Sequence, residues 1–175
     1  MDGIVEITEE RFKSSIHIKM NNVIEGFDKF YNITLTLDHN ISFDQKENKI
    51  INFIKTLYFS NSNSPSLFVD FYLTSLSQEE YSILLSKLDA HHRDILSKLR
   101  CENFSSVYFK IDNVELLEFF IKLSTRELFF ITFYFTNPSI TIWSNYNFNF
   151  LVFYDEHHTL DLLKDICETA SIAYY

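Results

Sequence analysis

The chain has no glycine between Phe27 and Tyr175, and its only glycines are Gly3 and Gly26. Phosphate-binding loops, dinucleotide-binding turns and nucleophile elbows all depend on glycine, which supplies positive φ angles and close backbone approach. The sequence therefore excludes P-loop, Rossmann-type and kinase-type folds and Gly-x-Ser-x-Gly hydrolases. We expect asparagine to form the tight turns instead, because Asn tolerates the left-handed conformation.

The composition predicts one globular domain that spans residues 1–175. Of the 175 residues, 46% are apolar and 17% aromatic, which is enough for a substantial core. The longest nearly apolar run, 128–135, is much shorter than the roughly 20 residues of a membrane-spanning helix. The first ten residues are acidic and lack the features of a signal peptide. We therefore expect a cytoplasmic protein that does not bind membranes, with Cys101 and Cys167 as isolated, reduced thiols.

The charge of the chain also limits its partners. Its formal net charge is −9, and nucleic acids and anionic membranes require a basic surface. Residues 128–158 are rich in aromatic rings but contain no Lys or Arg, so the rings lack the cations that accompany base stacking. We expect no nucleic-acid partner, whereas a basic protein would suit this charge.

Hydrophobic periodicity predicts an α+β fold, with a mixed, largely antiparallel sheet flanked by helices. Residues 128–135 are bulky on both faces, so this strand should be central and covered on both sides. A polar loop is expected at 60–65. The predicted helices are 44–59, 77–99, 113–123 and 155–169, capped by Asp44, Ser77, Asn113 and Asp155. The predicted strands are 15–20, 33–37, 66–73, 107–111, 127–136, 139–144, 148–154 and 172–175.

The segment from Asp155 to Asp161 contains the best candidates for chemistry. On a helix, His157 and Asp161 share a face, and His158 also comes close to Asp161. Imidazole and carboxylate groups together bind transition metals or act as general bases. However, the His-Glu-x-x-His zinc pattern is absent, and a polar first helical turn explains the same residues. We therefore expect no cofactor or metal, and keep His157, His158 and Asp161 as weak metal candidates.

Trp143 is the chain's only tryptophan. If Ile140 and Ile142 face the core, Trp143 lies on the opposite face of its strand. Exposed Trp and Tyr side chains surrounded by Asn and Ser are typical anchors of protein interfaces. A helix covering that face would bury the ring instead. The predicted partner-binding residues are Trp143, Asn145, Tyr146, Asn147, Asp155 and Glu156.

These features favour a small acidic protein-binding module rather than an enzyme. The specific hypothesis is an immunity- or antitoxin-type inhibitor that neutralises a basic toxin, such as a nuclease, by surface complementarity. Two alternatives remain. One is a metal-assisted enzyme that uses His157, His158 and Asp161. The other is an assembly subunit that forms a homodimer through an edge strand or the Trp143 face.

Overall fold

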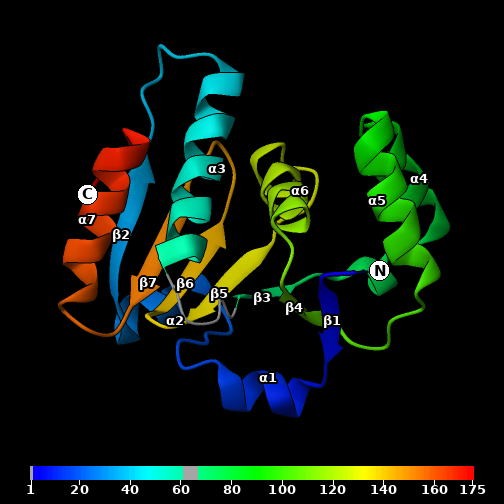
Figure 1. The fold of residues 1–175 in the computed structure, drawn as a ribbon, viewed down its shortest axis with the longest axis horizontal. Helices are drawn as coiled ribbons and strands as arrows, with labels where there is room; N and C mark the ends of the chain where they lie inside the picture. The colour runs from blue at the N-terminus through cyan, green and yellow to red at the C-terminus, as the bar shows by residue number, and fades with distance from the viewer. Residues whose placement is uncertain (1, 61–66) are drawn as a thin grey trace.

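The computed structural model of the chain describes residues 2–60 and 67–175. The strands within these ranges form one sheet in the order β1-β4-β3-β5-β6-β7-β2-β8, and each neighbouring pair is antiparallel (Figure 1). The predicted α+β class is confirmed, with a sheet that is wholly antiparallel in the described residues. The strands are β1 (Ile4–Ile7), β2 (Tyr31–Thr36), β3 (Leu67–Asp70), β4 (Tyr108–Ile111), β5 (Thr132–Thr136), β6 (Ser139–Ser144), β7 (Phe150–Tyr154) and β8 (Ala173–Tyr174).

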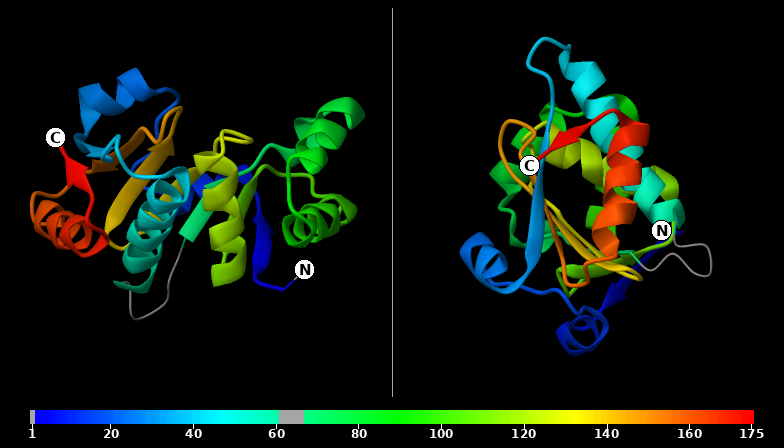
Figure 2. Two further views of the ribbon diagram at one scale, coloured as in Figure 1. Left: turned by 90° about the horizontal axis from the view of Figure 1, so that it is seen from above. Right: turned by 90° about the vertical axis from the view of Figure 1, so that its left-hand side faces the viewer.

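Helices cover both faces of this sheet. On one face α3 packs between α6 and α7, and on the other face lie α1 and α2 (Figures 1 and 2). The pair α4 and α5 lies at the end of the molecule that contains β1 and β4. The helices are α1 (Glu9–Ser15), α2 (Val23–Lys29), α3 (Phe43–Ser60), α4 (Gln78–Ser86), α5 (Ala90–Cys101), α6 (Val114–Thr125) and α7 (Thr159–Ala170). None of the helices in the described residues is long and apolar enough to cross a bilayer.

Strand β5 is central and covered on both sides, as its sequence predicts. Phe133 and Phe135 belong to the main core, together with residues of α3, α6 and α7. Tyr134 points to the other face, where it packs against Phe12 of α1. The alternation of side chains along a strand, combined with helices on both faces, explains why this segment is apolar throughout.

Several helix boundaries are set by local capping groups. Ser77 and Glu80 form the predicted capping box of α4, and Asn113 caps α6 as predicted. Helix α3 begins earlier than predicted, because Ser42 and Gln45 exchange hydrogen bonds there in place of a cap at Asp44.

Two predicted helices have different limits in the structure. The predicted helix 77–99 is wrong as one helix: α4 ends near Lys87, and Asp89 starts α5 by accepting a hydrogen bond from the His92 amide. The predicted cap of the last helix at Asp155 is also wrong. Helix α7 begins at Thr159 after His158, whose side chain makes no capping hydrogen bond.

Some predicted strands are shorter or absent. Residues 15–20 form no strand; Ile18 and Met20 instead lie in an irregular segment that packs against the sheet. Strand β3 ends at Asp70, and β7 starts two residues later than predicted. Strand β5 starts only at Thr132, because Glu127 adopts a positive φ of 55° and turns the chain. Of the predicted loop 60–65, residue Ser60 ends α3, and the remaining residues lie outside the described ranges.

Gly26 is required by close packing rather than by its backbone angles. A Cβ atom at this position would lie 2.6 Å from Met20 Sδ and 2.8 Å from Phe153 Cε1. Because the Phe153 ring is fully buried, it has little room to move. Gly26 therefore lets α2 approach Met20 and Phe153 more closely than a residue with a Cβ atom would allow.

Replacing Gly26 by alanine is expected to lower the free energy of unfolding by about 1–3 kcal/mol through overpacking. Urea unfolding would measure this change, with Asp28→Ala in the same helix as the control for helix propensity. Helix propensity alone predicts the opposite sign, a gain of up to about 1 kcal/mol. A stabilised Gly26→Ala variant would therefore contradict the packing argument.

Candidate functional site

The predicted partner-binding residues fall on two separate surfaces. Asn145, Tyr146 and Asn147 belong to the turn before β7, whereas Asp155 and Glu156 follow β7 at its other end. The five residues of β7 separate the two groups by about 17 Å at the usual rise per residue. A compact binding site at either end of β7 would therefore contain only some of the predicted partner-binding residues.

Trp143 lies under a covering segment. It faces away from the main core, as expected from Ile140 and Ile142, and its side chain is half-buried against Ile18, Met20 and Phe153. The covering chain is fixed in place by the Thr141 hydroxyl, which donates a hydrogen bond of 2.6 Å to the Ile18 carbonyl. The ring of Trp143 therefore serves mainly as packing for residues 18–30.

The end of the molecule that contains α2 and the β7–α7 connection presents exposed aromatic groups. Tyr31, at the start of β2, is 45% exposed, and its ring lies 4.3 Å from the imidazole of His157. Phe27 of α2 is 48% exposed and contacts Phe153 edge to face. One turn earlier on α2, Ile24 is 68% exposed. Apolar side chains of this size at high exposure in one region are typical of interaction surfaces.

Two carboxylates lie beside Tyr31. Asp28, Tyr31 and Asp155 line a cavity of about 460 Å³ together with Lys29 and Phe30. The positive charge nearby is largely neutralised: the Lys29 ammonium bonds Glu25 at 2.6 Å and lowers the pKa of that carboxyl to about 2. We call this surface the acidic aromatic face. It comprises Ile24, Phe27, Asp28, Tyr31, Asp155, Glu156 and His157.

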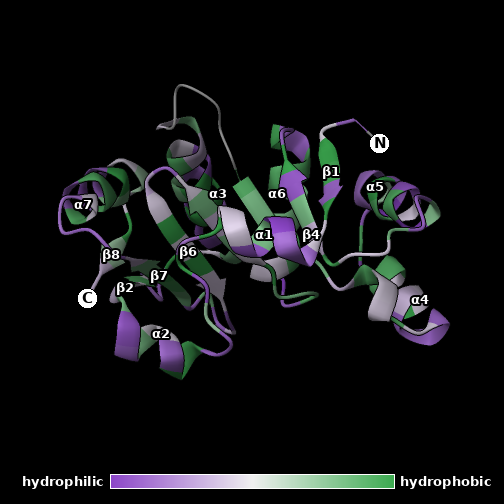
Figure 3. Cartoon of the chain, turned by 90° about the horizontal axis from the view of Figure 1, so that it is seen from below, coloured by the Kyte–Doolittle hydropathy of each residue, from purple (hydrophilic) through white to green (hydrophobic). Residues whose placement is uncertain are grey.

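The acidic aromatic face joins segments from distant parts of the chain at one end of the molecule (Figure 3). The sequence predicts Asp155 and Glu156 as partner-binding residues, but it does not predict Phe27 or Tyr31. The only feature of the sequence that could have pointed to Phe27 and Tyr31 is that each is a large aromatic residue with polar neighbours. Only the pairing of β2 with β7 brings Tyr31 beside Tyr154 and the start of α7.

The three weak metal candidates do not converge. His157 stacks on Tyr31, the His158 Nε2 lies 3.0 Å from Glu156, and Asp161 pairs with Lys164. Within residues 2–60 and 67–175 no three His, Cys, Asp or Glu side chains are placed to hold a metal ion. His92 and Cys167 are buried in the helices α5 and α7.

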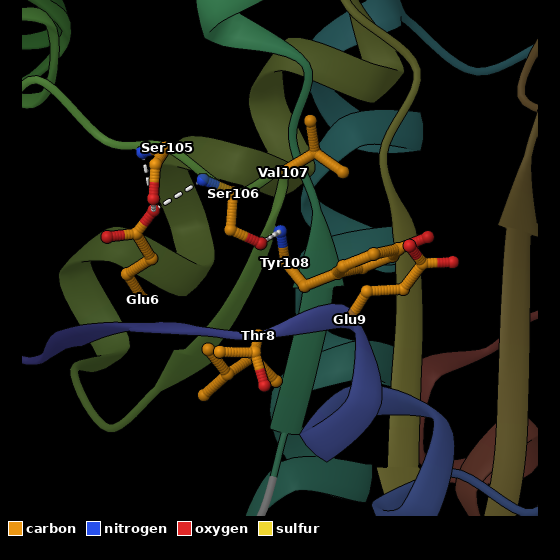
Figure 4. A pocket seen from close by; sticks show the side chains of 8 residues that line it. Glu6, Thr8, Glu9, Ser105, Ser106, Val107 and Tyr108 are labelled. Atoms are coloured by element: carbon orange, nitrogen blue, oxygen red, sulfur yellow. Dashed lines mark hydrogen bonds between the residues drawn. The ribbon is translucent and has the colours of Figure 1, made fainter.

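A second cavity of about 460 Å³ lies between the β1–α1 connection and β4 (Figure 4). Its main polar group, the Glu6 carboxylate, accepts hydrogen bonds from the backbone amides of Ser105 and Ser106. Burial opposes ionisation of Glu6, but these hydrogen bonds outweigh it and lower its pKa. Glu9 pairs with Lys13. Both carboxylates thus already have partners that explain their positions.

Beneath α1, a buried carboxyl group is surrounded by tyrosines. Asp70 Oδ1 accepts a hydrogen bond of 2.8 Å from the Thr132 amide, and Asp70 Oδ2 accepts one of 3.2 Å from the Tyr134 hydroxyl. Burial raises the pKa of Asp70 to about 6, and burial together with the Asp70 charge raises the pKa of Tyr134. The Phe12 ring packs over Tyr134 and Tyr108. This cluster anchors α1 to the sheet.

Comparison with known proteins adds no family to this description. No family model matches the chain, and neither the curated proteins nor the solved structures contain a significant match. The geometry of the described residues is therefore the basis for any functional proposal.

Proposed function

We propose that this protein is a protein-binding module that docks on a basic protein through the acidic aromatic face. The observation that carries the proposal is the half-exposed Tyr31 in a cavity that Asp28 and Asp155 also line, with the half-exposed Phe27 on the adjacent helix α2. Aromatic anchors contribute most of the binding energy in many interfaces, and the surrounding charges speed association and select the partner. The specific form we propose is an inhibitor of the immunity or antitoxin type, which neutralises a basic toxin such as a nuclease.

Three features of the face support this function. Its exposed rings are held by neighbouring rings, Phe27 by Phe153 and Tyr31 by His157, so little ordering is needed on binding. Segments 24–31 and 155–158 carry the carboxylates of Glu25, Asp28, Asp155 and Glu156 against the single lysine Lys29. This balance agrees with the charge of −9 for the chain. An acidic inhibitor surface would cover the basic substrate-binding surface of a nuclease.

The test uses co-expression with the product of the adjacent gene, followed by affinity purification and measurement of the dissociation constant. We expect a basic partner whose binding is weakened at least tenfold by Tyr31→Ala, the loss typical of an aromatic anchor. The matched control is Tyr146→Ala, which removes an equally large exposed tyrosine from the other end of β7. We expect this control to change the dissociation constant by less than twofold.

A charge reversal separates the two contributions of the face. Glu156→Lys should slow association and make it less dependent on salt, because it weakens attraction to a basic partner. Glu79→Lys, on exposed α4, makes the same change in net charge away from the face. Equal effects of the two charge variants, or no effect of Tyr31→Ala, would overturn the assignment of this face. The face would instead join two copies of the chain if the protein in solution has twice the mass of one chain and Tyr31→Ala reduces it to the mass of one.

A further inference from the structure

We propose that a third cavity binds a small molecule in which a phosphate or carboxylate group is joined to an apolar body. The cavity has a volume of about 610 Å³ and lies between the start of α3, the α6–β5 turn and the β6–β7 turn. These segments lie at the upper side of the molecule in Figure 1, away from the connection between β7 and α7. The site is therefore separate from the acidic aromatic face. Its volume is in the usual range for ligand sites.

The cationic groups of the cavity are Lys46 and Arg126, and His39 adds an imidazole. Lys46 forms no ion pair with any residue that the structure describes. It can therefore pair with an incoming anion without first breaking an ion pair.

The guanidinium of Arg126 is held in a fixed orientation by Glu47. Its Nε and Nη2 donate hydrogen bonds of 2.9 and 2.8 Å to the two carboxylate oxygens of Glu47. Glu47 is itself buried and accepts a further bond from the Thr125 hydroxyl. Nη1 of the guanidinium takes no part in this bidentate contact with Glu47. A guanidinium positioned in this way presents its remaining donors to an oxyanion at a low cost in entropy.

The other lining groups suit the apolar part of the ligand. Phe43 and Phe148 contact each other edge to face, with ring centroids 5.1 Å apart. The one carboxylate in the lining, Glu127, accepts a hydrogen bond of 2.7 Å from the Asn147 amide. That bond occupies one of its oxygens and joins the two turns that border the cavity. The cavity thus combines the ammonium of Lys46, unpaired among the described residues, and the Glu47-bound guanidinium of Arg126 with one carboxylate and an aromatic wall. Lys46 supplies the charge that would attract an amphipathic anion.

The backbone around the cavity includes non-glycine residues in the left-handed conformation. Glu127, Asn147 and Phe148 all line the cavity and have φ angles of 55–57°, although none is glycine. Asn147 tolerates this conformation, but for Glu127 and Phe148 it costs of order 1 kcal/mol or more, and such angles tend to cluster at functional sites. This clustering also gives a role to the Asn145–Asn147 turn, which lies outside the acidic aromatic face.

The experiment titrates the full chain with phenyl phosphate and, separately, with benzoate, to distinguish a phosphate from a carboxylate ligand. Calorimetry and the amide NMR shifts of Asn147 and Phe148 report binding. We expect saturable binding of at least one anion, weakened at least tenfold by Lys46→Gln. Benzyl alcohol, which has the ring without the charge, should not saturate the site. The matched control is Lys87→Gln, an exposed lysine at a different cavity.

Two results would overturn the proposal. One is the absence of saturable binding for both anions. The other is equal binding by the Lys46→Gln and Lys87→Gln variants, which would place the anion elsewhere. Because Lys46 and Lys87 are outside the core, thermal unfolding of both variants should match that of the natural chain and exclude misfolding as an explanation.

Discussion

Replacing Arg126 by methionine is expected to lower the free energy of unfolding by about 3 kcal/mol. Glu47 is only 4% exposed, and Arg126 supplies two of its three hydrogen bonds to other side chains. Burial alone would raise the pKa of Glu47, but the hydrogen bonds from Arg126 and Thr125 hold it below its ordinary value. Methionine removes the two bonds from Arg126 and leaves only the Thr125 hydroxyl on a buried carboxylate, whose ionisation is then costly.

Urea unfolding at pH 7 would measure this loss. The double variant Glu47→Leu/Arg126→Met should recover most of the lost stability, because replacing both members of a buried pair removes the unpaired charge. Lys98→Met serves as the control, since it breaks the exposed Lys98–Asp94 pair and should cost less than about 1 kcal/mol. A cost below about 1 kcal/mol for Arg126→Met would show that Glu47 reaches water or another donor.

The Asp70→Asn variant is expected to change how stability depends on pH. Burial raises the pKa of Asp70 from 3.8 to about 6, so the folded chain binds this proton more tightly than the unfolded chain does. Between pH 4 and 6, the contribution of Asp70 to stability therefore decreases as the pH rises, and above about pH 7 it is constant. A shift of this size corresponds to a loss on the order of 3 kcal/mol.

Asparagine has no charge to bury, and its carbonyl oxygen can still accept the Thr132 amide. The stability of Asp70→Asn relative to the natural chain should therefore increase between pH 4 and 7. Urea midpoints measured for both proteins at several pH values would test this difference. Other carboxylates, including Glu118 with its pKa lowered to about 2 by Lys55, titrate equally in both proteins and cancel. Parallel pH profiles would contradict the raised pKa.

Elements with local signals were well predicted from the sequence. The capping box of Ser77 and Glu80, the cap at Asn113 and the apolar stripe of α3 all act within a few residues, so a window of the sequence contains their causes. The long predicted helix 77–99 failed for a related reason. Its apolar pattern continues through residues 87–89. The helix nevertheless breaks there, because the Asp89 carboxylate accepts a hydrogen bond from the His92 amide and so starts the new helix α5.

The candidate interface was only partly predictable. Asp155 and Glu156 were identified as polar residues after a strand, but Tyr31 and Phe27 were not. Their partners, His157 and Phe153, lie more than a hundred residues away in the sequence, and nothing in the local pattern indicates that they meet. Trp143 shows the converse case. Its face was correctly inferred from alternation along β6, but its covering segment was predicted as a strand.

The sequence by itself determined the α+β class, most helices and strands, and the exclusion of folds that depend on glycine-rich loops. These properties follow from the periods of strands and helices and from capping bonds that span a few residues. The tertiary structure alone decided the strand order, the covering of Trp143, the acidic aromatic face and the cavity around Lys46 and Arg126. Each of these depends on burial and pairing between segments that are distant in the sequence. The free energy of such contacts depends on which groups are close in space and not on their separation along the chain.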